Sequence, residues 1–201
     1  MLNAQANVPL VCHSSTPCGP VRAIQVRVHR PTAARLDLIY GVQGDIARLL
    51  VPPTSEPRRT DGLWQHTCFE VFLATGEGPA YYEFNFSPST QWAAYRFDSY
   101  RKGMNPVVSL SWPRVYVDRD ADRFTLSAAL DLESLPDLTG TSLARLALTA
   151  VIEDTDHHIS YWAVAHPSGT PDFHHSDAFA LTLPGPSTLP GEYPGDQERS
   201  R

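Results

Sequence analysis

Ten short runs rich in β-branched and aromatic residues follow one another along this chain, and no convincing helix-length amphipathic segment lies between them. Turn formers such as Thr-Gly-Glu-Gly-Pro at 75–79 and Ser-Gly-Thr-Pro at 168–171 separate the runs. The pattern predicts an all-β chain, folded as an antiparallel β-sandwich. The best helical segment, residues 131–138, contains Pro136 and therefore predicts only a short helical insertion. The ten runs are residues 24–28, 36–42, 68–74, 81–86, 91–97, 114–117, 124–130, 146–152, 159–165 and 178–183.

The two ends of the chain differ from its middle in composition. A length of 201 residues suits a single domain. Residues 1–20 and 184–201 are rich in Pro, Gly and Ser, so we expect an irregular N-terminal segment and a flexible tail. The β-sandwich domain is then expected to occupy residues 21–183.

The charge and hydropathy of the chain restrict the kinds of molecule that it can bind. The formal charge is −6, from 16 Lys and Arg against 22 Asp and Glu. This acidic balance argues against nucleic acid as a partner, because binding a phosphate backbone requires a concentrated basic surface. No apolar run approaches the roughly 20 residues that cross a membrane, and no secretory signal is apparent at the start. We therefore expect a cytoplasmic protein with a small-molecule partner, and homo-oligomer formation stays open.

The cysteines Cys12, Cys18 and Cys68 are too few and too scattered for a disulfide framework, so we expect reduced thiols. A redox pair or half a metal site at Cys12 and Cys18 is the alternative. The chain contains no G-x-G-x-x-G fingerprint and no P-loop, and no cofactor is expected.

Alternation along three neighbouring runs, 68–73, 81–86 and 92–97, sorts their side chains onto two faces of a sheet. The predicted core face carries Phe69, Val71, Leu73, Tyr82, Phe84, Phe86, Ala93, Tyr95 and Phe97. The opposite face collects Glu70, Tyr81, Glu83, Asn85, Trp92 and Arg96. Carboxylates, an amide and a guanidinium beside aromatic rings suit a polyhydroxylated ligand such as a sugar. An ordinary solvated sheet face with a surface ion pair is the alternative.

Several segments carry a family resemblance: WQHTCFEVF at 64–72, YYEFNFSP at 81–88, QWAAYRF at 91–97, SYWAVAHP at 160–167 and PDFHH at 171–175. On these segments, residues 20–183 resemble the DOMON-like group related to family 9 carbohydrate-binding modules, specifically its murB-like subgroup. The resemblance implies a β-sandwich that binds a sugar or haem noncovalently. It assigns the subgroup no enzymatic activity.

The resemblance also implies site residues. In the sugar-binding relatives two tryptophans sandwich a sugar ring, and Trp64 and Trp162 correspond to them here. Glu70 and Arg96 correspond to the side chains that form hydrogen bonds with the sugar hydroxyls. A core position is the alternative for Trp162, since its neighbours look packed. Together with the polar face, the candidate ligand-binding set is Trp64, Glu70, Glu83, Asn85, Arg96 and Trp162. No residue is assigned a catalytic role.

Metal binding and haem binding would use histidines outside the polar face. His166, Asp172 and His174 are weak candidates for a metal site, with hydrogen-bonded loop histidines as the preferred interpretation. Haem binding would use Met104 with His166, His174 or His175, although the chain departs from the haem-binding relatives because it has only Met1 and Met104.

The enzyme alternatives use the same strands. Glu70 and Glu83 are a candidate acid and base pair for a hydrolase, and Cys68 near His66 is a weaker candidate nucleophile. An exposed sheet edge or aromatic patch would instead suit a protein-interaction domain. We favour a non-catalytic small-ligand-binding module, most of all a carbohydrate-binding one. The alternatives are a metal-dependent or carboxylate-based hydrolase, a haem-binding domain and a protein-interaction domain.

Overall fold

The computed structural model describes residues 5–74, 76, 78–108, 111–135, 138 and 145–182. Within these residues the chain is built of β-strands joined by loops and single-turn 3-10 helices, so the all-β prediction is confirmed. The strands are β1 (Gln5–Cys12), β2 (Val21–Thr32), β3 (Arg35–Gly44), β4 (Cys68–Ala74), β5 (Tyr81–Phe86), β6 (Trp92–Phe97), β7 (Asn105–Pro106), β8 (Arg114–Arg119), β9 (Arg123–Asp131), β10 (Arg145–Glu153), β11 (Ile159–Ala163) and β12 (Leu181–Thr182). The 3-10 helices are η1 (Ile46–Arg48), η2 (Leu63–Gln65) and η3 (Ser176–Ala178).

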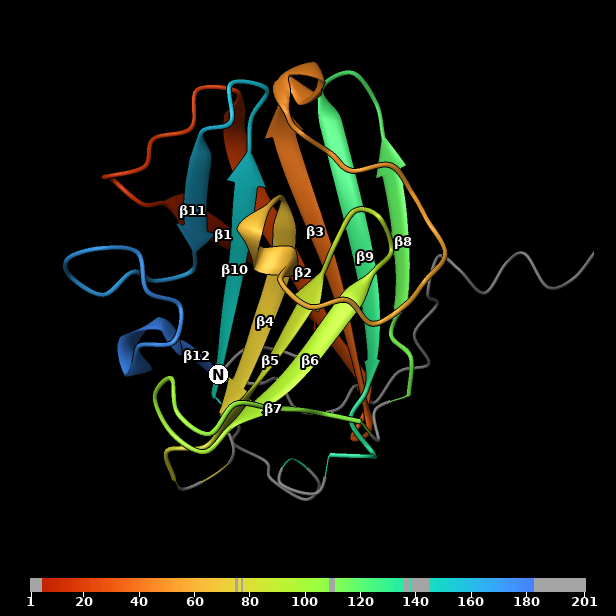
Figure 1. Cartoon of the computed structure of the whole chain (residues 1–201), viewed down its shortest axis with the longest axis vertical. Helices are drawn as coiled ribbons and strands as arrows, with labels where there is room; N and C mark the ends of the chain where they lie inside the picture. Colours follow the sequence, from red (N-terminus) through yellow and green to blue (C-terminus); the bar gives the residue numbers. More distant parts are fainter. Residues whose placement is uncertain are drawn as a thin grey trace, which may run out of the picture.

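The strands form one curled antiparallel sheet in the order β7-β6-β5-β4-β10-β11-β1-β2-β3-β9-β8, with β12 paired to β10. The sheet folds back on itself into two layers (Figure 1): the β4 layer, from β7 to β11, and the β3 layer, from β2 to β8. Strand β1 joins the layers, because its residues 5–10 pair with β2 while Val11 and Cys12 pair with β11. The predicted antiparallel sandwich is therefore confirmed.

The main core lies between the layers. Phe69 on β4 is fully buried, with its ring 5.2 Å from that of Tyr40 on β3 and stacked 5.7 Å from that of Phe124 on β9. The Tyr40 hydroxyl donates a 2.6 Å hydrogen bond to the main-chain oxygen of Glu70, which fixes the spacing of the layers at this point. Strand β2 follows the pattern of a half-buried strand, with Val26 and Val28 inward and Gln25 and Arg27 exposed.

The outer face of the β4 layer is also covered. Phe72, Tyr81 and Phe97 on this face pack with Phe173 and Phe179 of the segment that follows β11. All seven residues of β4 and all six of β5 are consequently buried. The polar face predicted from alternation is therefore not an open solvated sheet, and its carboxylates lie beneath a cover.

Three predicted segments differ in the structure. Part of the 1–20 segment, predicted to be irregular, is strand β1, because Val8 and Leu10 alternate into the core within an otherwise Pro- and Ser-rich stretch. Within the described part of the run 178–183, residues 178–182, Ala178 ends η3 and the one strand is the two-residue β12. In 131–138, Asp131 ends β9 and a turn follows, while residues 136 and 137 lie outside the described residues, as does the predicted tail 184–201.

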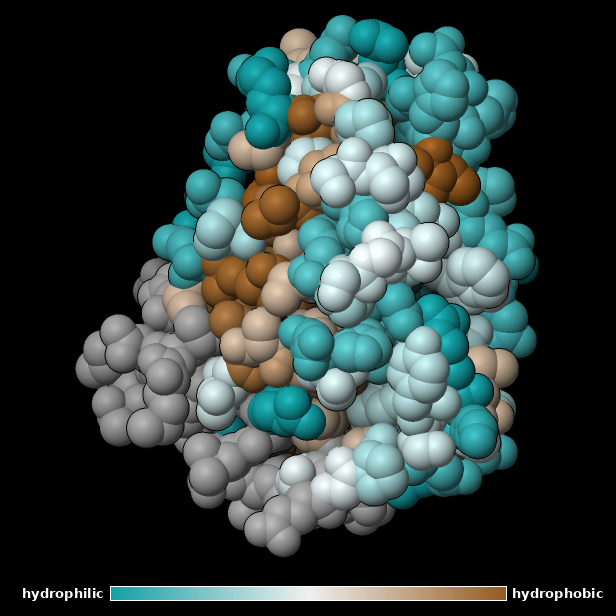
Figure 2. All heavy atoms as spheres, turned by 90° about the vertical axis from the view of Figure 1, so that its left-hand side faces the viewer, coloured by the Kyte–Doolittle hydropathy of each residue, from teal (hydrophilic) through white to brown (hydrophobic). Residues whose placement is uncertain are grey.

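Figure 2 views the side on which β11 lies in Figure 1, and hydrophobic residues gather there in a band flanked by hydrophilic ones. No helix within the described ranges has the length and apolar character to span a membrane.

Candidate ligand-binding site

A cavity of about 1050 Å³ opens on the outer face of the β4 layer. This volume is at the upper end of the range typical of small-ligand pockets. Its lining comes from six strands and three loops: Asp61, Gly62, Trp64, Gln65, Glu70, Phe72, Glu83, Tyr95, Phe97, Arg101, Met104, Pro106, Val151, Tyr161, Pro171, Phe173 and His174. The walls are largely aromatic and aliphatic, and the polar groups are few and concentrated, as in pockets that bind small molecules.

Two carboxyl groups lie at the floor of the cavity. Glu70 on β4 is 2% exposed and Glu83 on β5 is 5% exposed. They share one face of neighbouring strands, since Glu70 stands opposite Asn85 and Glu83 opposite Phe72. Glu70 accepts a 3.0 Å hydrogen bond from the Thr149 hydroxyl, and Glu83 accepts a 2.7 Å bond from the Asn85 side-chain amide.

Burial changes the acidity of both floor carboxyls. Loss of hydration, followed by repulsion from Glu83, raises the pKa of Glu70 well above its ordinary value. Loss of hydration raises the pKa of Glu83 to about 7, although the Asn85 hydrogen bond and the Arg101 charge act in the opposite direction. Near neutral pH the pair therefore retains a proton.

The side of the cavity carries a charged pair and a histidine. Arg101, in the turn after β6, forms a 2.8 Å ion pair with Asp172 of the loop after β11. His174 Nδ1 lies 2.8 Å from the Tyr81 hydroxyl, and its Nε2 lies 3.8 Å from Glu83 Oε2. Burial, with the nearby Arg101 charge, lowers the pKa of His174 to about 4, so the ring is neutral at pH 7.

An aromatic side chain stands at the edge of the cavity. Trp64, on η2, lines the cavity and is 51% exposed. Gly62 begins η2 with φ of 76°, a left-handed conformation that glycine adopts without strain. Next to it, Asp61 accepts a 2.7 Å hydrogen bond from the Tyr95 hydroxyl, which ties the start of the turn to β6.

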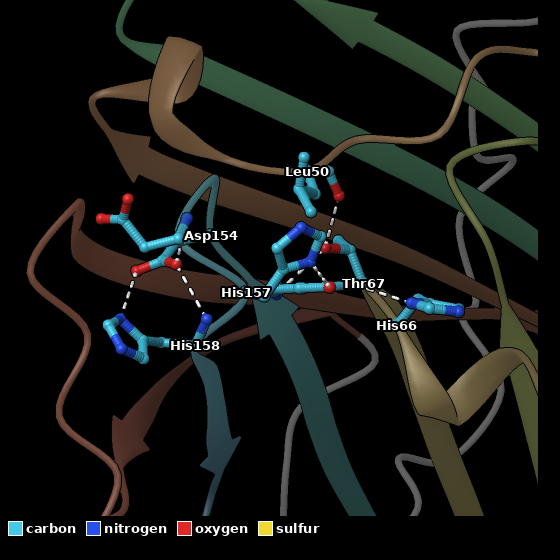
Figure 3. Close-up of polar contacts among 8 residues, drawn as sticks. Leu50, His66, Thr67, Asp154, His157 and His158 are labelled. Atoms are coloured by element: carbon cyan, nitrogen blue, oxygen red, sulfur yellow. Dashed lines mark hydrogen bonds and ion pairs between the residues drawn. The ribbon is translucent and has the colours of Figure 1, made fainter.

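The other end of η2 is tied to β10. His66, the residue that follows η2, places Nδ1 2.7 Å from a carboxylate oxygen of Glu153, and His157 Nδ1 lies 2.9 Å from the other oxygen. Thr67 links the same segments, because its hydroxyl donates to the Leu50 carbonyl and accepts from the Glu153 amide (Figure 3). The two imidazoles lower the pKa of Glu153, against the effect of desolvation. This network fixes the segment that carries Trp64.

Asp154 shapes the adjacent hairpin turn. Its carboxylate accepts hydrogen bonds from the amides of Asp156 (2.9 Å) and His158 (3.0 Å) (Figure 3). Among the described residues, Asp154, Asp156 and His158 are the one group of three or more His, Cys, Asp or Glu whose ligating atoms lie within 4.8 Å of one another. The bonds to the turn account for the position of Asp154 without an ion.

The cavity brings together three of the six residues predicted to bind ligand: Trp64, Glu70 and Glu83. Asn85 lies beneath them, fully buried, and orients Glu83.

Arg96 and Trp162 do not lie in the cavity. Arg96 pairs with Tyr82 across β5 and β6 and so shares the face of Trp92 and Ala94, which belong to the main core. It forms a 2.7 Å ion pair with Asp98. The prediction that Arg96 shares a face with Glu70 is wrong, because both faces of β6 are largely apolar and alternation alone does not show which one faces the core.

Trp162 is 5% exposed and packs in the main core, where its indole N–H donates to the Ser160 hydroxyl. Its predicted role as a second ligand platform is therefore wrong, and the core alternative describes it.

The three residues predicted as weak metal ligands do not converge on one point. His166 Nε2 lies 2.8 Å from the Val11 carbonyl oxygen, Asp172 pairs with Arg101, and His174 lines the cavity. Each side chain thus has a separate protein partner.

Sequence reasoning missed Arg101, Tyr95, Phe97 and Phe173. Tyr95 stands directly opposite Glu83, and Phe97 opposite Tyr81, so both belong to the face of the carboxyls. The pairing of β5 with β6 shows which face of β6 lies beside the carboxyls. The sequence of β6 does not show this, because the residues of both of its faces are largely apolar.

The residues suggested for haem fit that cofactor poorly. Met104 and His174 both line the cavity. However, one ring nitrogen of His174 is bonded to Tyr81 and the other lies 3.8 Å from Glu83, so both already have protein neighbours where an axial ligand needs a free nitrogen.

Comparisons with known proteins bear on the fold. No family model matches the chain, and no curated protein matches it. A structure from Bacteroides uniformis described as a "putative carbohydrate-binding protein" aligns with 87% of this chain and 84% of its own, at a TM-score of 0.57 and 13% identity. A family 9 carbohydrate-binding module from Caldicellulosiruptor kristjanssonii aligns in its glucose complex over 81% of this chain and 75% of its own, at a TM-score of 0.48 and 12% identity. Its cellotriose complex covers 89% and 80%, with a TM-score of 0.47 and 12% identity. The chain thus shares its β-sandwich fold with the Bacteroides structure.

Proposed function

We propose that this chain is a non-catalytic module that binds a carbohydrate in the cavity above Glu70 and Glu83. The observation that carries the proposal is the combination, in one cavity, of an exposed indole at the edge and buried hydrogen-bonding groups at the floor. A sugar ring presents apolar C–H faces to aromatic side chains and hydroxyls to carboxyls, so one ring satisfies both kinds of surface. The Bacteroides protein that shares the fold is itself described as a "putative carbohydrate-binding protein".

The first test is isothermal titration calorimetry with a panel of mono- and disaccharides. We expect at least one sugar to bind, and we expect Trp64→Ala to weaken its binding by about two- to tenfold, since a stacked aromatic contact contributes roughly 0.5–1.5 kcal/mol. Tryptophan fluorescence should change on binding to the wild type.

Two variants serve as controls. Trp112 is 67% exposed and lies outside the cavity, and Arg96 lies on the other face of β6. Trp112→Ala and Arg96→Ala should therefore bind the same sugar within about twofold of the wild type. Absence of heat with every sugar, together with unchanged fluorescence, would reject the proposal.

A carboxylate-based hydrolase is the second candidate, favoured by the proximity of Glu83, with a pKa of about 7, to a second carboxyl. In a glycosidase two carboxyls flank the scissile bond. Here both project from adjacent strands of one sheet face, so they would approach a ligand from the same side. We expect no release of p-nitrophenol from p-nitrophenyl glycosides. Release that disappears in both Glu70→Gln and Glu83→Gln would establish the hydrolase instead.

Two finer assignments accompany the main proposal. Membership of the DOMON-like group, in its murB-like subgroup, is supported by the sequence segments given above. A cytoplasmic location is supported by the composition of the chain, and fractionation of cells that produce the natural protein tests it.

A further inference from the structure

The cavity carries an excess of acidic groups. Asp61, Glu70 and Glu83 line it, and its one lining Arg or Lys among the described residues is Arg101. The charge of Arg101 is already matched, because Asp172 lies 2.8 Å from it and the Tyr100 hydroxyl also bonds Asp172. His174 adds no positive charge at neutral pH.

Among the described residues, neither floor carboxyl forms a direct ion pair with a Lys or Arg side chain, and Arg101 is paired with Asp172 instead. Glu70 is bonded by the neutral Thr149 hydroxyl and Glu83 by the neutral Asn85 amide. Nε2 of His174 lies 3.8 Å from Glu83, but that ring is neutral at pH 7 and supplies no positive charge. Two buried carboxyl groups with no cation beside them retain a proton, because a second negative charge would be neither hydrated nor neutralised there. A cation that bound between them would neutralise that charge, so the proton would be released.

The other titratable groups around the pair leave this balance unchanged. The tyrosines are neutral at pH 7, as is Cys68, whose thiol pKa is raised well above its ordinary value by burial and by the two carboxyls. The strands contribute Tyr40 on β3, Cys68 on β4, Tyr81 on β5 and Tyr95 on β6. The loops contribute Asp61 before η2, Arg101 after β6, and Asp172 and His174 after β11.

We infer that the preferred ligand carries a primary ammonium group, as an amino sugar does, and that this group binds between Glu70 and Glu83. The inference rests on the proposed function and specifies its ligand class. On binding, the ammonium keeps its three protons, the carboxyl pair loses the proton it holds, and that proton passes to the solvent. Anionic sugars are disfavoured by the same excess of carboxyls.

The test compares matched sugars at pH 7 by calorimetry: glucosamine, galactosamine and mannosamine, each with its parent hexose and its N-acetyl derivative. We expect one amine to bind at least tenfold more tightly than both of its uncharged partners. Measured in phosphate and in HEPES, neither of which carries a primary amine, the enthalpies should differ by the heat of buffer protonation, with up to one proton released per ligand. In Glu83→Gln the preference for the amine should fall at least fivefold, and the isosteric amide keeps an oxygen that can accept the Asn85 hydrogen bond.

The outcomes separate this inference from the proposed function. Equal binding of the amine and its parent hexose, or retention of the full preference in a Glu70→Gln/Glu83→Gln variant, would overturn the ammonium site while leaving a carbohydrate-binding module. No binding by any sugar of the set or of the wider panel would overturn both.

Discussion

Replacement of Phe69 by alanine is expected to lower the free energy of unfolding by about 3–5 kcal/mol. Phe69 is fully buried and contacts Tyr40 and Phe124, which lie on two strands of the opposite layer. Its removal leaves a cavity where the layers meet, and the strands cannot close it without breaking the Tyr40 hydrogen bond to the Glu70 carbonyl. Urea denaturation, followed by circular dichroism and fluorescence, measures the change.

Trp112→Ala is the control for this experiment, because Trp112 is largely exposed. Its effect should stay within about 0.5 kcal/mol. A loss below about 1 kcal/mol in Phe69→Ala would mean that the two layers do not pack through this ring.

Glu83→Gln is expected to stabilise the protein above neutral pH by up to about 3 kcal/mol and to have little effect near pH 4.5. The folded protein raises the pKa of Glu83 from 4.5 to about 7, so the native state binds the proton more tightly than the unfolded state. The protonated carboxyl is accommodated at low pH, and stability falls as the pH rises from about 4.5 through 7. The expected stabilisation follows from the raised pKa, at about 1.4 kcal/mol per pKa unit. Glutamine mimics the neutral carboxyl at every pH.

Urea denaturation of both proteins between pH 4.5 and 8.5 measures this difference. His174 gives wild type and variant alike a contribution of the opposite sign: its pKa is lowered to about 4, so its stabilisation is lost as the pH falls from 6.5 toward 4. Because His174 Nε2 lies 3.8 Å from Glu83, the two proteins are compared above pH 7, where His174 is neutral and the difference between them reports on Glu83. Glu56→Gln, in an exposed loop, is the matched control and should follow the wild type. A Glu83→Gln curve that is parallel to the wild type would show that Glu83 is ionised in the fold without cost.

Local alternation was sufficient for the strands that have one clear apolar set. In β4 and β5 the aromatic and aliphatic residues recur at every second position, so the inward direction of Phe69 and Phe84 and the shared face of Glu70 and Glu83 followed from period two alone. In β6 both sets are largely apolar, and only the pairing of Glu83 with Tyr95 decides which one faces the cavity. The assignment of Arg96 failed there for this reason.

By itself the sequence determined the β-sandwich class, most of its strands and the presence of two acidic side chains on one sheet face, because these depend on properties repeated every second residue. Only the tertiary structure decided that this face is covered, that Arg101 and His174 reach it, and that Trp162 is buried in the core. The cover comes from segments after β6 and β11, far from β4 along the chain. Their docking depends on ring contacts such as Phe72 with Phe179, which no local periodicity encodes.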